Sequence, residues 1–88
     1  MSKEDLRETL EGLRAEVSSL PEDAGPVRDR VNGLIRDLEH QLQDLDNAGH
    51  RATMRDRVAR LIEEIEAEHP AITAMLDRIM AALTSLGI

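Results

Sequence analysis

Apolar residues recur along nearly the whole chain at alternating spacings of three and four positions. Near the amino end, for example, Leu6, Leu10, Leu13, Val17 and Leu20 follow one another in this way, as in a heptad pattern. Such spacing places side chains on one face of an α-helix, whereas a half-buried strand alternates with a period of two. The pattern therefore predicts an all-α, coiled-coil-like protein, an antiparallel bundle of three to four helices that forms a single domain over residues 1–88.

Breaks in the apolar pattern divide the chain into four expected helices. Pro21 to Pro26 form the clearest break, because two prolines and a glycine favour a turn and Pro26 suits a first helical position. Gly49 is expected to stop the second helix in a left-handed conformation, and Thr53 is expected to cap the third. Asn32-Gly33 could form a turn, but the apolar phase continues through it. The predicted helices span about residues 2–19, 26–46, 52–68 and 70–86.

Pro70 predicts the relation between the last two helices. It lacks a backbone donor and disfavours helical dihedral angles at His69, so the third helix is expected to end or kink there. With no loop between them, the last two helices would run in line over about 50 Å, against roughly 27 to 32 Å for each of the first two. The fourth helix would then overhang the others and form a homodimer or partner interface. The predicted interface residues are Ile72, Met75, Leu76, Ile79, Met80, Leu83 and Leu86.

Charges follow the same order along the second and third helices. The third begins with arginines, among them Arg55 and Arg57, and ends with acids such as Glu64. The second likewise runs from basic residues to acids such as Asp37. If the two helices are antiparallel, each basic half faces the acidic half of the other. The alternative is that the charges form exposed pairs within one helix, such as Arg60 with Glu64.

Composition narrows the classes of function. The chain has no Phe, Tyr, Trp or Cys, and its formal net charge is −7. An acidic chain without aromatic stacking residues is a poor nucleic-acid binder, and no apolar stretch reaches the length of a membrane span. The charged start of the chain argues against export and the absence of cysteine fits a reducing compartment, so we expect a cytoplasmic protein.

Candidate chemistry is sparse. Glu66 with His69, and Asp37 with His40, have the three-residue spacing that di-metal sites in helical bundles use. Such sites need further inward carboxylates from other helices, so solvent-facing histidines are the favoured interpretation. No activated nucleophile, phosphate loop or zinc-ligand set is present. We therefore expect no enzyme, no catalytic or metal-binding residues and no cofactor.

Three segments carry a resemblance to a known family. They are Met1 to Leu10 (MSKEDLRETL), Glu66 to Thr73 (EAEHPAIT) and Ala82 to Ile88 (ALTSLGI). With them the chain resembles the small bacterial proteins of domain-of-unknown-function family 4404. The resemblance implies a bacterial, cytoplasmic, helical protein without an assigned activity, and it transfers no site residue.

These observations favour a non-enzymatic interaction or scaffold protein that associates with itself. Two alternatives stay open. The fourth helix could receive a helix of another protein, or the bundle could bind metal through Asp37, His40, Glu66 and His69.

Overall fold

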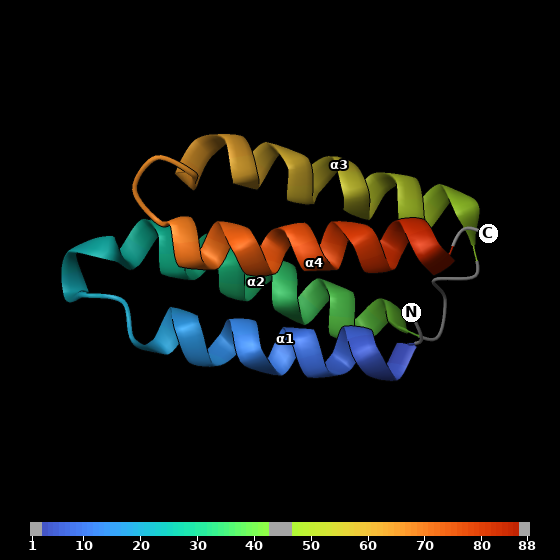
Figure 1. Cartoon of the computed structure of the whole chain (residues 1–88), viewed down its shortest axis with the longest axis horizontal. Coiled ribbons are helices and arrows are strands. Elements are labelled where there is room, and N and C mark those ends of the chain that lie inside the picture. The colour runs from blue at the N-terminus through green and yellow to red at the C-terminus, as the bar shows by residue number, and fades with distance from the viewer. Residues whose placement is uncertain (1–2, 43–46, 87–88) are drawn as a thin grey trace.

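The computed structural model describes residues 3–42 and 47–86, and these residues form four α-helices, one short 3-10 helix and no strand (Figure 1). The all-α prediction is therefore confirmed. The predicted start of the first helix, at residue 2, lies outside the described residues. So does the predicted end of the second helix, residues 43–46, which includes Leu45. The elements are α1 (Lys3–Ser18), η1 (Glu22–Ala24), α2 (Gly25–Gln41), α3 (Ala48–Ile65) and α4 (Pro70–Leu86).

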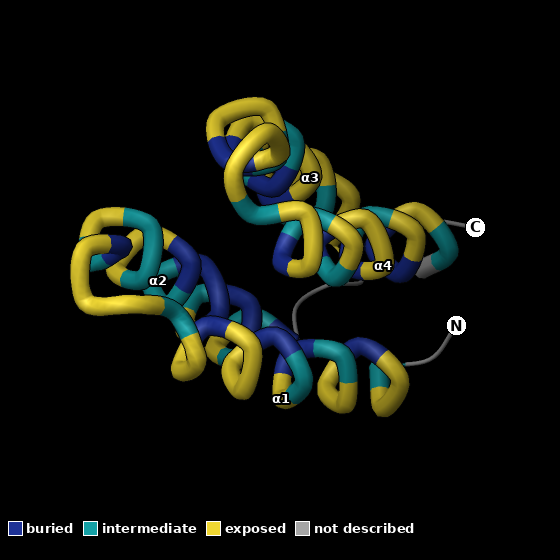
Figure 2. The backbone as a smooth tube through the Cα atoms, turned by 60° about the vertical axis from the view of Figure 1, so that its left-hand side comes forward, coloured by how far each residue is buried: buried dark blue, intermediate teal, exposed yellow. Residues whose placement is uncertain are grey.

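The four helices form an antiparallel bundle with principal extents of 38 × 21 × 18 Å. Figure 1 shows that successive helices run in opposite directions, so that α1 is parallel to α3 and α2 to α4. Contacts link α1 to α2, α2 to α3, α3 to α4 and α4 back to α1. The helices thus surround one core, on which their buried faces converge (Figure 2).

The in-line arrangement of the last two helices is wrong. α3 ends at Ile65, three residues earlier than predicted, and the chain turns at Glu66–His69 before α4 begins. The Ile65 carbonyl accepts from the backbone amides of both Glu68 and His69, at 3.1 and 2.8 Å, and so closes the turn. α4 then packs back against both α3 and α1. Pro70 is the first residue of α4, where no amide donor is needed, so it starts a helix and kinks none.

Asn47 caps α3, which begins at Ala48, four residues before the predicted start of that helix. Its side-chain oxygen accepts from the amides of Gly49 and His50 at 2.8 and 3.2 Å, which satisfies two donors that a helix start leaves unpaired. The prediction that Gly49 stops the second helix is therefore wrong. Gly49 lies inside the first turn of α3, and no glycine among the described residues has a positive φ.

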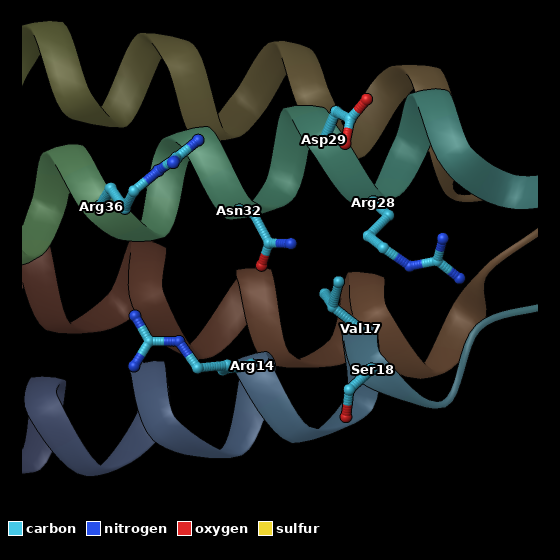
Figure 3. A pocket seen from close by; sticks show the side chains of 7 residues that line it. All are labelled: Arg14, Val17, Ser18, Arg28, Asp29, Asn32 and Arg36. Carbon is cyan, nitrogen blue, oxygen red and sulfur yellow. The ribbon is translucent and has the colours of Figure 1, made fainter.

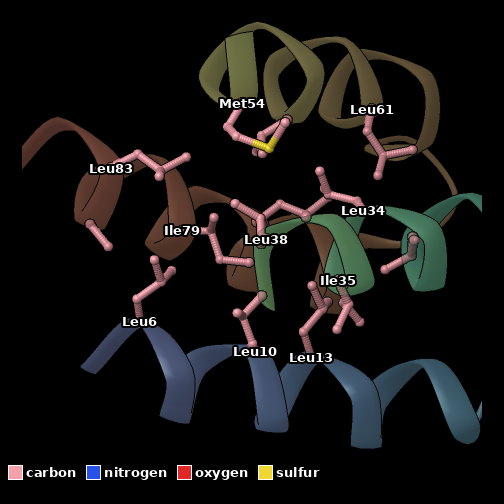
Figure 4. Packing of buried hydrophobic residues seen from close by; sticks show 14 of the residues in the cluster. Leu6, Leu10, Leu13, Leu34, Ile35, Leu38, Met54, Leu61, Ile79 and Leu83 are labelled. Atoms are coloured by element: carbon pink, nitrogen blue, oxygen red, sulfur yellow. The ribbon is translucent and has the colours of Figure 1, made fainter. Parts of the chain in front are cut away.

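The core contains aliphatic and methionine side chains, and none of the described residues buries a polar or charged side chain. Figure 4 shows how residues from all four helices meet in it. Gly12 of α1 supports the close approach of α4, because a Cβ atom there would lie 2.6 Å from Cε of Met75. α2 is continuous through Asn32 and Gly33, as predicted.

Candidate functional site

The predicted interface on the fourth helix is largely inside the protomer. Ile72 is 2% exposed, and Leu76, Ile79 and Leu83 are fully buried between the helices, while Met75 and Met80 pack at the edge of the core. The side chain of Leu86 lies outside the described part of the chain. A partner cannot reach the four buried side chains in this fold, so the overhang argument for an interface no longer holds. Self-association itself stays a prediction.

The surface that α4 presents to solvent is a different one. Its central part consists of Ala71, Ala74, Asp77, Arg78 and Ala81, and the exposed residues Pro70 and Thr84 lie toward the two ends of the helix. Asp77 and Arg78 are the only charged residues of α4, so this surface carries far less charge than the exposed faces of the other helices. We call these five residues the outer face of α4.

A second surface feature lies between α1 and α2, where a groove of about 600 Å³ opens. Figure 3 shows Arg14 and Arg36 at one end, Arg28 toward the other, and Asn32 between them with its amide turned toward α1. We call it the arginine groove. It is lined by Arg14, Val17 and Ser18 of α1 and by Arg28, Asp29, Asn32 and Arg36 of α2.

Two of the three arginines of this groove have partners within the protein. Arg14 is ion-paired with Glu39 at 2.5 Å. Arg28 donates to the carbonyl oxygens of Leu20 and Pro21 at 2.7 and 3.0 Å, beyond the end of α1. Carbonyl oxygens are neutral acceptors, so Arg28 keeps its full charge. Arg36 is exposed and has no ion-pair partner among the residues that the structure describes.

Ion pairs bridge the interface between α2 and α3. Arg57 pairs with Asp37 at 2.5 Å, and Arg30 pairs with Glu64. The basic half of each helix therefore faces the acidic half of the other, which confirms the prediction from charge order. A pair within one helix also forms, but it joins Arg60 to Asp56 rather than to Glu64.

The residues considered for metal binding do not come together. Asp37 is engaged with Arg57, and His40 is exposed beside Arg36 and Glu39. Glu66 and His69 lie in the turn between α3 and α4. Within residues 3–42 and 47–86, no three His, Cys, Asp or Glu side chains form a group that could hold a metal ion.

Sequence reasoning missed the arginine groove. Its one signal in the sequence is the spacing of Arg28, Asn32 and Arg36, which are four residues apart and so lie on one side of a helix. That spacing alone does not show whether a neighbouring helix leaves space beside them. Arg14 comes from another part of the chain, and only the packing of α1 beside α2 adds it to the site.

Comparison with known proteins gives a family but no relative of known function. None of the helices in the described part of the chain combines the length and the apolar character needed to cross a membrane. No curated protein and no solved structure matches the chain. A family described as a domain of unknown function (DUF4404) matches residues 6–88, nearly the full length. The protein therefore belongs to the DUF4404 family.

Proposed function

We propose that the protein is a non-enzymatic helical interaction module that associates weakly with a second copy of itself through the outer face of α4. The observation that carries the proposal is the character of that face, on which two opposite charges stand among small apolar residues. The cytoplasmic location expected from the sequence is part of the same proposal.

Helix geometry indicates how two copies would meet. Successive residues of a helix point about 100° apart, so Asp77 and Arg78 occupy opposite edges of the outer face, on either side of Ala74 and Ala81. If two α4 helices run parallel about a two-fold axis, Asp77 of each copy lies beside Arg78 of the other. An antiparallel pair would instead place like charges opposite each other. Charge complementarity therefore favours the parallel dimer.

The size of the face predicts a weak dimer. A helix of 17 residues is about 25 Å long and presents a face about 10 Å wide. Two such faces would bury roughly 500 Å², whereas stable interfaces bury about 1,200 Å² or more. We therefore expect association only at high protein concentration, unless the neighbouring surfaces of α1 and α3 add contacts.

Cross-linking tests the arrangement, since the chain has no cysteine of its own. Ala74 of one copy would face Ala74 of the other across the parallel two-fold axis, so Ala74→Cys should form a disulfide-linked dimer under mild oxidation. Ala52→Cys, on the exposed side of α3, is the matched control and should remain mostly monomeric. Non-reducing gels measure the linked fraction. Equal cross-linking of the two variants would contradict the proposal.

Sedimentation equilibrium tests the role of the charges. Asp77→Arg and Arg78→Asp should each weaken association by placing like charges together, and the double exchange should restore it. A wild-type protein that remains monomeric at its highest soluble concentration would rule out self-association through this face.

A further inference from the structure

The arginine groove has a charge opposite to that of the chain as a whole. Its ionisable lining residues are Arg14, Arg28, Arg36 and Asp29, whereas the complete chain carries a formal charge of −7. Asp29 also lines the groove between α2 and α3, and it lies on the side of α2 away from α1 in Figure 3. Arg14 is paired with Glu39, so the positive charge of the groove comes from Arg28 and Arg36. The groove is therefore a local positive surface on an acidic protein, and no residue of α4 lines it.

Three hydrogen-bonding side chains stand in a row along this groove. Arg28, Asn32 and Arg36 occupy successive turns of α2, so neighbours in the row are separated by about 6 Å along the helix axis, and the two arginines by about 12 Å. An amide side chain can both donate and accept, and the side chain of Asn32 makes no hydrogen bond with the described residues. The row thus offers two cations with an unused amide between them.

Contacts within the protein explain the position of Arg28 in this row but not that of Arg36. The bonds from Arg28 to the carbonyl oxygens beyond α1 explain the position of its side chain, because a cation stabilises the end of a helix. The acceptors are neutral carbonyl oxygens, so these bonds leave the charge of Arg28 without a counter-ion. The side chain of Arg36 has no such structural task, since it makes no hydrogen bond or ion pair with the described residues.

We propose that the arginine groove binds a short acidic peptide segment of a partner protein. Two carboxylates of the peptide pair with Arg28 and Arg36, and Asn32 bonds to the peptide backbone between them. An extended chain advances about 3.3 Å per residue, so acidic residues four positions apart match the 12 Å between the two arginines. Guanidinium groups pair strongly with carboxylates. A single small anion cannot bridge the two sites.

Fluorescence anisotropy provides the test. The probe is the peptide Glu-Gly-Gly-Gly-Glu labelled with fluorescein, and the chain adds no aromatic fluorescence of its own. The full-length protein should bind this peptide at low ionic strength and should not bind Lys-Gly-Gly-Gly-Lys.

Arg36→Gln should weaken binding at least about fivefold, the effect of roughly 1 kcal/mol. The matched control is Arg55→Gln on α3, which removes the same charge from another exposed residue without an ion pair in the described structure. It should change binding less than about twofold.

A second variant and a competitor complete the design. Asn32→Ala keeps the charge and should also weaken binding, with an unchanged thermal midpoint as evidence that the fold is intact. Inorganic phosphate should compete only weakly, since it reaches one arginine at a time. The proposal is overturned if the wild type does not bind the acidic peptide, if Arg55→Gln weakens binding as much as Arg36→Gln, or if phosphate displaces the peptide at equal concentration.

Discussion

Replacing Gly12 and Gly33 by alanine, one at a time, tests the position of α4. Both glycines lie inside helices, Gly12 in α1 and Gly33 in α2. Apart from the adjacent residues and the local helix backbone, a Cβ atom added at Gly33 would have no heavy atom within 4 Å, whereas one added at Gly12 would lie 2.6 Å from Cε of Met75. The two substitutions are therefore alike in the helix backbone and differ in what the new methyl group contacts.

The expected free energies follow from these two distances. Alanine is favoured over glycine inside a helix by about 1 kcal/mol, so Gly33→Ala should stabilise the protein by roughly 0.5 to 1 kcal/mol. At Gly12 the same gain is opposed by overpacking. Carbon atoms pack best at about 3.5 to 4.0 Å, so the methyl group of Met75 must move by about 1 Å. Such crowding costs about 1 to 3 kcal/mol in cores, with flexible methionine near the low end. Gly12→Ala should therefore be neutral or destabilise by up to about 2 kcal/mol.

Urea and thermal unfolding, followed by circular dichroism, measure both variants. In a domain of this size 1 kcal/mol shifts the melting temperature by about 4 to 8 °C. A double-mutant cycle of Gly12→Ala with Met75→Ala should show a coupling of at least about 0.5 kcal/mol, because the smaller residue removes the clash. If α4 continued in line with α3, Gly12 and Met75 would not meet. Equal stabilisation by the two alanines, with no coupling to Met75, would refute the folded-back arrangement.

Two further predictions concern the core and the ion pairs. Leu76→Ala should destabilise the protein by about 2.7 to 5 kcal/mol at every protein concentration, because Leu76 is fully buried within one protomer; a loss of stability that depends on concentration in urea titrations would instead place Leu76 in an interface. Arg57→Glu should lower the free energy of unfolding by up to about 1 kcal/mol, and adding Asp37→Arg should restore part of it at low salt. Absence of coupling in that cycle would show that the pair between α2 and α3 does not stabilise the bundle.

Hydrophobic periodicity was sufficient to predict which residues enter the core. Leu6, Leu10, Leu13 and Val17 are buried as their spacing indicates, since the period of a helix fixes which side chains share a face. The direction of α4 could not be predicted in this way. In an antiparallel pair both apolar stripes face the same core, so the phase appears to continue from Ile65 to the next helix although the chain reverses between them.

The cap of α3 and the arginine groove were harder to predict from the sequence than the core. Asn47 and Thr53 can both cap a helix, and only the observed hydrogen bonds to Gly49 and His50 show that Asn47 does so. The arginine groove depends on how far apart α1 and α2 lie, and on the meeting of Arg14 with residues of a different helix. The sequence pattern of a single helix predicts neither the distance between α1 and α2 nor the position of Arg14 beside α2.

The position of α4 between α1 and α3 has a consequence for synthesis on the ribosome. Of the four helices α4 is translated last, yet it covers the apolar face of α1, which is translated first. At roughly 5 to 20 residues per second, the interval between Val17 and Leu86 lasts roughly 3 to 14 s. During that time the nascent chain exposes a row of leucines that nothing else in the bundle can cover fully. We therefore expect the nascent chain to expose a segment that chaperones can bind until α4 emerges.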